Sequence, residues 1–272
     1  MTHSGADIAQ LLSAHGVTPS RALGQNFVAD PNTVRRIARL AGVGAGDHVL
    51  EIGAGLGSLT LALAETGAGV VAVELDRHVL PALHAVVAPA GVEVVEGDAM
   101  TLDLAGLLAE RSPAPWSLVA NLPYNLATPL VLRVLTEVPA VVRLLVMVQR
   151  EVGERMAAAP GSKAYGSVSV RVAYFARATV VGRVPAAVFV PRPRVESVLV
   201  GLERRPVPAV DPAQVSYERL AEVVRAGFAQ RRKMLRRSLA GVVEPEAFGR
   251  AAIRPDARAE ELDVVAWGRL AR

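Results

Sequence analysis

The sequence of 272 residues contains no cysteine, and aromatic residues make up only 4% of it. Without cysteine the chain has no disulfide framework, no thiolate zinc site and no cysteine nucleophile. The most apolar run, residues 138–148, is interrupted by Arg143 and is too short to span a bilayer. The first sixteen residues lack the basic-then-apolar order of a signal peptide. We therefore expect a cytoplasmic protein that makes no contact with membranes and holds no metal.

Lysine is also scarce, because it occurs only at positions 163 and 233. Residues 1–189 carry 14 basic and 15 acidic side chains, whereas residues 190–272 carry 16 basic and 11 acidic ones. The net charge is thus −1 in the first part and +5 in the last. Such an excess is expected of a surface that binds a polyanion such as a nucleic acid. A coding bias toward arginine is the alternative explanation.

Hydrophobic residues account for 51% of the chain, which is enough for one good core and a smaller appended domain. Short apolar segments alternate with helical patterns, which favours an α/β fold with a parallel sheet covered on both faces. The predicted strands are 47–52, 70–74, 92–96, 118–121 and 143–148, and the predicted helices are 32–43, 58–66, 79–87 and 130–137. Residues 168–175 and 197–203 alternate more strictly, which favours an antiparallel edge.

A connector rich in proline and arginine, residues 185–194, precedes a change of pattern. After about residue 212 the periodicity is helical, and the predicted helices are 217–230, 232–240 and 259–270. We therefore expect a Rossmann-like domain over residues 1–206 and a small α-helical domain over residues 207–272.

A glycine-rich turn follows the first predicted strand. Gly53, Gly55 and Gly57 allow the chain to turn sharply and to approach a ligand closely. Glu74 ends the second strand, 21 residues beyond Gly53, where an acidic side chain can bind a ribose diol. The pattern indicates a nucleotide-like cofactor, although plain turn glycines and a solvated acid are the alternatives.

Two further residues distinguish between the two possible cofactors, a dinucleotide and S-adenosylmethionine. Ser58 stands where the dinucleotide fingerprint requires its third glycine. Asp98 follows the third strand, where its carboxylate can accept a hydrogen bond from an adenine amino group. Both features favour S-adenosylmethionine over a dinucleotide, and the fold is then a Rossmann-like S-adenosylmethionine-dependent methyltransferase domain.

The quartet Asn121-Leu122-Pro123-Tyr124 follows the fourth predicted strand. The Asn121 side-chain oxygen and the Leu122 carbonyl can accept the two hydrogens of an exocyclic amine, while Pro123 holds the turn rigid. The Tyr124 ring offers a stacking face for the base, and Phe189 is the candidate for a second face. The quartet therefore predicts methyl transfer to a nucleobase amine, with an ordinary turn as the alternative.

These motifs resemble those of the ribosomal RNA adenine N6,N6-dimethyltransferases, and most closely the small-subunit (KsgA/RsmA) branch of that family. The blocks that carry the resemblance are 23–27 (LGQNF), 51–57, 121–125, 189–197 and 228–239 (FAQRRKMLRRSL). The resemblance covers roughly residues 20–240. It implies dimethylation of two adjacent adenosines near the 3′ end of 16S rRNA, with S-adenosylmethionine as methyl donor and a small-subunit precursor as partner. We expect the protein to act as a monomer.

The resemblance also implies which residues contact the cofactor, namely Asn26, Val28, Gly53, Glu74, Asp98 and Asn121. The chain departs mildly from the family pattern, which usually has leucine at position 28 and proline at position 54. The macrolide-resistance (Erm) branch, which acts on 23S rRNA, tends to have serine at position 24 and isoleucine at position 122. Gly24 and Leu122 therefore favour the small-subunit branch.

Four basic residues, Arg232, Lys233, Arg236 and Arg237, stand at the spacing of one helix face. They would offer a stripe of positive charge to RNA phosphates, and a solvated helix face is the alternative. A non-catalytic RNA-binding assembly factor on the same fold stays open as a different functional class, since some relatives of the family act as mitochondrial transcription factors.

Overall fold

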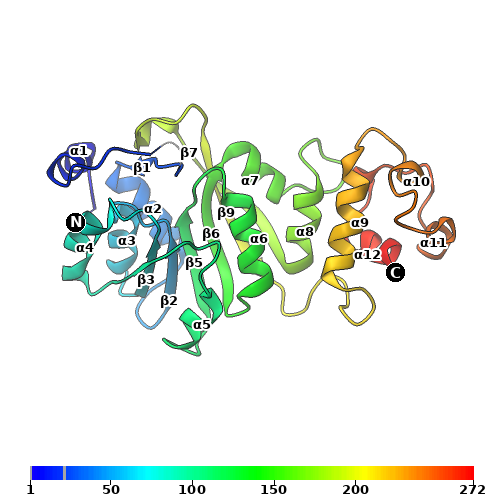
Figure 1. The fold of residues 1–272 in the computed structure, drawn as a ribbon, viewed down its shortest axis with the longest axis horizontal. Coiled ribbons are helices and arrows are strands. Elements are labelled where there is room, and N and C mark those ends of the chain that lie inside the picture. The colour runs from blue at the N-terminus through cyan, green and yellow to red at the C-terminus, as the bar shows by residue number, and fades with distance from the viewer. Residues whose placement is uncertain (1, 21–22) are drawn as a thin grey trace. The chain divides into compact units, whose positions relative to one another are not determined.

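The computed structural model describes residues 2–20 and 23–272, and the chain divides into two compact units (Figure 1). The first unit comprises residues 1–153 and 180–202, and the second comprises residues 154–179 and 203–272. This division differs from the single boundary expected at residue 206, because residues 154–179 join the second unit. Tyr165, Val170 and Tyr174 lie in the hydrophobic core of that unit, which explains the difference.

A seven-stranded mixed sheet has the strand order β4-β3-β2-β5-β6-β9-β7, and most of its residues belong to the first unit (Figure 1). Strands β4, β3, β2, β5 and β6 pair in parallel, as their continuous apolar sequences predict. A short antiparallel pair, β1 and β8, forms a separate sheet. The strands are β1 Phe27–Val28, β2 His48–Ile52, β3 Gly69–Glu74, β4 Glu93–Glu96, β5 Trp116–Asn121, β6 Val141–Gln149, β7 Ala176–Val184, β8 Phe189–Val190 and β9 Ser197–Arg204.

Helices cover the sheet because each presents one apolar stripe to it. Val34 and Ile37 of α2 and Leu59 and Leu63 of α3 pack in one core with sheet residues such as Val119. The helices of the first unit are α1 Gly5–Ala14, α2 Pro31–Ala41, α3 Ser58–Ala64, α4 Leu80–Val87, α5 Leu104–Ala109 and α6 Ala127–Glu137, and α7 Arg150–Met156 spans the boundary between the units.

The second unit is helical, with α8 Ser167–Phe175, α9 Tyr217–Ala229, α10 Leu235–Ser238, α11 Pro245–Arg250 and α12 Val264–Ala271. Its core surrounds Trp267, which is fully buried. Gly227 of α9 allows this close packing, since a Cβ atom there would lie 2.3 Å from the Trp267 ring. No helix in the described part of the chain is long and apolar enough to cross a membrane.

Three sequence predictions are wrong in detail. Residues 168–175 form helix α8 rather than a strand, because Val170 and Tyr174, one helical turn apart, both face the core of the second unit. The helix expected over 232–240 is reduced to α10, since the amides of Leu235 and Arg236 bind the carbonyls of Ala257 and Pro255. The helix expected over 259–270 is divided into a 3-10 turn and α12, with Asp263 as the N-cap of α12.

Candidate active site

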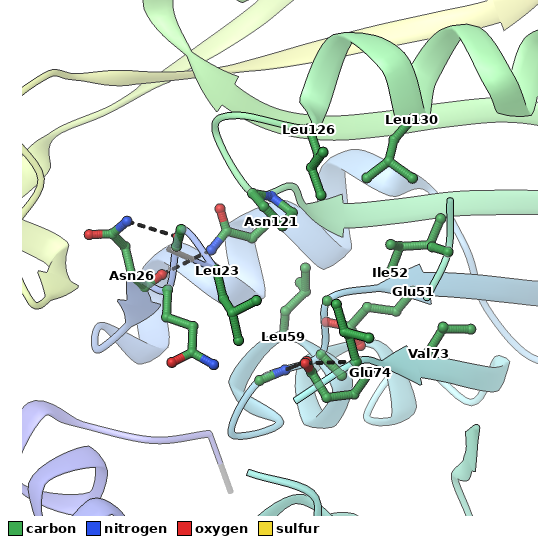
Figure 2. A pocket seen from close by; sticks show the side chains of 18 of the residues that line it. Leu23, Asn26, Glu51, Ile52, Leu59, Val73, Glu74, Asn121, Leu126 and Leu130 are labelled. Atoms are coloured by element: carbon green, nitrogen blue, oxygen red, sulfur yellow. Dashed lines mark hydrogen bonds between the residues drawn. The ribbon is translucent and has the colours of Figure 1, made fainter. Parts of the chain in front are cut away.

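A hollow of about 1010 Å³, which includes the open space at its mouth, lies at the carboxyl ends of β2, β3 and β5 (Figure 2). In open α/β sheets ligands bind at this edge. The walls come from the segment before β1, the glycine turn after β2, the end of β3, the loop after β4 and the Asn121 quartet. All of these segments belong to the first unit, so that this unit by itself builds the site.

The glycine turn has the backbone conformation that its sequence predicts. Gly53, Gly55 and Gly57 have φ angles of 77°, 57° and 81°, which L side chains rarely adopt. A Cβ atom on Gly55 would also lie 2.9 Å from the ring of Phe27. The Gly55 amide donates a hydrogen bond of 2.7 Å to Glu74 Oε2, which ties the turn to the end of β3.

Glu74 is buried at the wall of the hollow and binds three backbone amides. Its carboxylate accepts from Gly55 and, at 2.9 Å each, from Leu75 and Asp76. Burial raises the pKa of Glu74, and these three amide donors offset part of that rise because they favour the ionised form. Asp98 lines the same hollow and accepts from the Met100 amide at 2.8 Å. The two acids therefore stand at the ends of neighbouring strands, Glu74 as the last residue of β3 and Asp98 two residues beyond β4.

Asn121 ends β5 and lies beside Asn26 at the wall of the hollow (Figure 2). Its Nδ2 donates to the main-chain carbonyl of Asn26 at 3.1 Å, and the Asn26 side chain donates to the Gly24 carbonyl at 3.0 Å. This hydrogen bond fixes the orientation of the Asn121 amide, and therefore the direction of Oδ1, which is the hydrogen-bond acceptor of that side chain.

The other members of the quartet have distinct surroundings. Leu122 is buried, and its amide donates to the Met147 carbonyl at 3.1 Å, which extends the pairing of β5 with β6. Pro123 lines the hollow. Tyr124 is partly buried, and its hydroxyl lies 2.9 Å from Ser197 Oγ. Burial raises the pKa of the Tyr124 phenol.

The remaining predicted contacts lie on the small sheet. Val28 pairs with Phe189, and Val28 lines the hollow although its side chain is buried. Phe189 is only 2% exposed and packs in the core with α2 and α3, so in this structure the ring offers no free stacking face. Its role as the second stacking face would require the ring to leave that core.

The structure adds residues that the sequence had not singled out. Gln25 lines the hollow, and its Nε2 donates to Asp76 Oδ2 at 2.7 Å, which ties the segment before β1 to the loop after β3. Gln25 lies within the block 23–27, but no pattern in the sequence indicates that its partner is Asp76, 51 positions further along. Glu51 also lines the hollow and is 1% exposed (Figure 2). The signal in the sequence was a glutamate inside an apolar strand, two residues before Gly53.

Comparison with solved structures places the fold among the methyltransferases. A dimethyladenosine transferase from Plasmodium falciparum superposes with a TM-score of 0.71 at 24% identity and covers 89% of this chain and 94% of that chain. The 23S rRNA methyltransferase ErmE superposes with a TM-score of 0.69 at 24% identity, covering 90% of this chain and 98% of that one. The chain therefore has the fold of these two methyltransferases.

Sequence comparison identifies the family. The family model described as ribosomal RNA adenine dimethylase matches residues 18–271, and the chain belongs to this family. The ribosomal RNA small subunit methyltransferase A of Nocardia farcinica is 47% identical over 98% of this chain and 93% of its own length. The protein of the same name from Bifidobacterium adolescentis is 45% identical over 98% of this chain and 92% of its own length.

The residues of the hollow fit the cofactor of this family. Gly55 allows the glycine turn to pack closely against Phe27 at the wall of the hollow, and Glu74 at the end of β3 and Asp98 just after β4 bring two carboxylates to it. Such acids suit a ribose diol and an adenine amino group. S-adenosylmethionine, when bound, supplies an activated methyl group on a sulfonium. Within residues 2–20 and 23–272, no group of three or more acidic or histidine side chains could hold a metal ion.

Proposed function

We propose that this enzyme transfers methyl groups to N6 of two adjacent adenosines near the 3′ end of 16S rRNA. Family membership and the relatives named ribosomal RNA small subunit methyltransferase A support this substrate. The observation that carries the chemistry is the hydrogen bond from Asn121 Nδ2 to the Asn26 carbonyl, because it orients the Asn121 amide at the hollow.

An adenine N6 amine is a poor nucleophile, because its lone pair is delocalised into the ring. Asn121 Oδ1 and the Leu122 carbonyl would accept its two hydrogens and favour a pyramidal nitrogen whose lone pair is free. For Leu122, the fixed position of the carbonyl follows from the hydrogen bond between its amide and the Met147 carbonyl. Positioning of this kind can supply at most roughly 7–11 kcal/mol of a barrier, and preorganised dipoles add to it.

The target base must leave its stack to reach the hollow. The Tyr124 ring would then stack on it, which is worth roughly 1–3 kcal/mol per base. Asn26, Val28, Gly53, Gly55, Glu74 and Asp98 would hold the cofactor, all of which line the hollow. Arg232, Lys233, Arg236 and Arg237 would bind rRNA phosphates, and each of these four side chains is exposed.

We further propose that the natural substrate is a small-subunit precursor, that the protein acts as a monomer, and that it works in the cytoplasm, where small subunits are assembled. The RNA of such a particle exposes phosphates over a broad surface. A broad phosphate surface could bind the four basic residues as well as the target base, although these residues are far from the quartet in sequence.

The test is methyl transfer from labelled S-adenosylmethionine to small subunits that lack the modification, followed by mapping of dimethyladenosine in both rRNAs. We expect label at two adjacent adenosines of 16S rRNA. Asn121→Ala should lower transfer at least about a hundredfold, the scale for loss of a preorganised group, and should leave subunit binding nearly unchanged. Label in 23S rRNA would support the Erm-type activity instead. Binding without transfer by the unaltered protein would support the assembly factor.

A further inference from the structure

Ser197 is a polar residue at a position where an apolar one would be expected. It begins β9, and the next three residues of this strand, Val198, Leu199 and Val200, are buried and apolar. The Ser197 side chain itself is 0% exposed. A buried hydroxyl without a hydrogen-bond partner destabilises a fold. We therefore expect the Ser197 hydroxyl to have a hydrogen-bond partner.

The partner is the hydroxyl of Tyr124, 2.9 Å from Ser197 Oγ. Either hydroxyl can donate. The two residues lie 73 positions apart, so the sheet rather than the local sequence brings them together. Tyr124 belongs to the quartet that follows β5, whereas Ser197 belongs to a strand two places along the sheet.

The start of β9 lies at the same edge of the sheet as the active site. The Glu196 carbonyl accepts from the Arg150 amide at 3.0 Å, and Arg150 directly follows the last residue of β6. Asn121 at the end of β5 pairs with Met147 near the end of β6. Ser197 therefore reaches the quartet from the part of the sheet that lies beyond β6.

We infer that Ser197 is a positioning residue for methyl transfer, which fixes the ring of Tyr124 through the phenolic hydroxyl. A tyrosine side chain that is attached to the backbone at one end and hydrogen-bonded through its hydroxyl at the other has a fixed ring axis, because the phenolic oxygen lies on that axis. A fixed axis holds the ring in one place beside the quartet, so that the stacked base has one position relative to the methyl donor. This inference rests on the proposed function, because it assigns the ring of Tyr124 to base stacking.

The geometry separates this role from that of a cofactor contact. Neither Ser197 nor Tyr124 lines the hollow that would hold the cofactor. Loss of the hydrogen bond should therefore lower kcat and leave the affinity for S-adenosylhomocysteine unchanged. A misplacement of about 1 Å can cost about a hundredfold in rate. For a ring that keeps its stacking surface, we expect a loss of about tenfold, which corresponds to about 1.4 kcal/mol.

The experiment is a double-mutant cycle on the full chain with Ser197→Ala, Tyr124→Phe and the combined variant. The readouts are kcat and KM for unmethylated small subunits, and the Kd for S-adenosylhomocysteine. We expect each single variant to lose about tenfold in kcat and to keep the Kd within about twofold. The combined variant should be no slower than either single one, because both remove the same hydrogen bond.

Ser117→Ala is the matched control, since Ser117 is a buried serine of the same sheet, on β5, at 5% exposure. It should keep the kcat of the unaltered protein. A Ser197→Ala variant with unaltered kcat, or single losses that multiply in the combined variant, would overturn the inference alone. If the unaltered protein transfers no methyl group, the proposed function fails and this inference fails with it. If Ser197→Ala and Ser117→Ala lose the same activity, Ser197 only fills the core and the inference is overturned.

Discussion

At the scale of single residues, Glu51 is the least expected side chain of the site. It lines the hollow with 1% exposure, and its Oε2 has no hydrogen-bond partner in the described part of the chain. Burial raises the pKa of Glu51 to about 8, the Thr60 hydroxyl offsets part of this rise, and the Glu74 carboxylate adds to it. Thr60 is near enough to act on the charge, although its Oγ1 does not meet the geometry of a hydrogen bond. The carboxyl is thus neutral in the folded protein at neutral pH.

This shift predicts a pH dependence of stability. Between the ordinary pKa of 4.5 and the folded value of about 8, the unfolded chain has lost the Glu51 proton and the folded chain keeps it. The contribution of Glu51 to the free energy of unfolding should therefore be largest below pH 4.5 and fall by about 1.4 kcal/mol per pH unit up to pH 8. Urea unfolding of the unaltered protein and of Glu51→Gln, at several values in this range, measures the difference. Parallel curves for the two proteins would contradict the prediction, because a glutamine side chain cannot titrate.

At the scale of elements, the glycine turn after β2 combines a left-handed backbone with a close contact. Gly55 has a φ of 57°, and a Cβ atom there would meet the Phe27 ring at 2.9 Å. Phe27 is buried, and it packs with Leu56 of the turn and Ile8 of α1. The start of β1 and the turn therefore fit against each other, and both line the hollow.

Gly55→Ala should be more harmful than an ordinary glycine substitution. A non-glycine residue in the left-handed region costs about 1–2 kcal/mol, and the clash with Phe27 should add about 1–3 kcal/mol of overpacking. Gly42→Ala is the matched control, since Gly42 has a φ of 62° and a Cβ atom there would have no neighbouring atom within 4 Å. Urea unfolding and binding of S-adenosylhomocysteine should both show a larger loss for Gly55→Ala. Equal losses in both variants would mean that Phe27 moves aside at no cost.

At the scale of the whole molecule, the two units carry net charges of opposite sign. The first unit carries 12 basic and 15 acidic side chains, and the second carries 18 basic and 11 acidic ones. The net charges are thus −3 and +7, a sharper contrast than a division by sequence position gives. The helical unit is therefore the part of the chain that suits a polyanion.

The salt dependence of RNA binding tests whether the basic residues of the helical unit bind RNA phosphates. Alanine at Arg232, Lys233, Arg236 or Arg237 should weaken binding to small subunits, and it should lower the slope of log K against log salt by about 1 for each phosphate that is no longer neutralised. Arg254→Ala is the control, because Arg254 is exposed but pairs with Glu261 at 3.1 Å. It should leave the slope nearly unchanged. An unaltered slope in all four variants would assign these residues to a solvated surface.

The sequence by itself determined the parallel strands, the glycine turn, the acids at the strand ends and the quartet, because each depends on local periodicity or on a fixed spacing. It also determined the family, which the comparisons confirmed. Only the tertiary structure decided that residues 167–175 are helical, since Val170 and Tyr174 face a core supplied by residues beyond 210. The same holds for Gln25 with Asp76 and Tyr124 with Ser197, hydrogen bonds between residues 51 and 73 positions apart. Contacts of this kind depend on which strands become neighbours, and strand order leaves no local pattern in the chain.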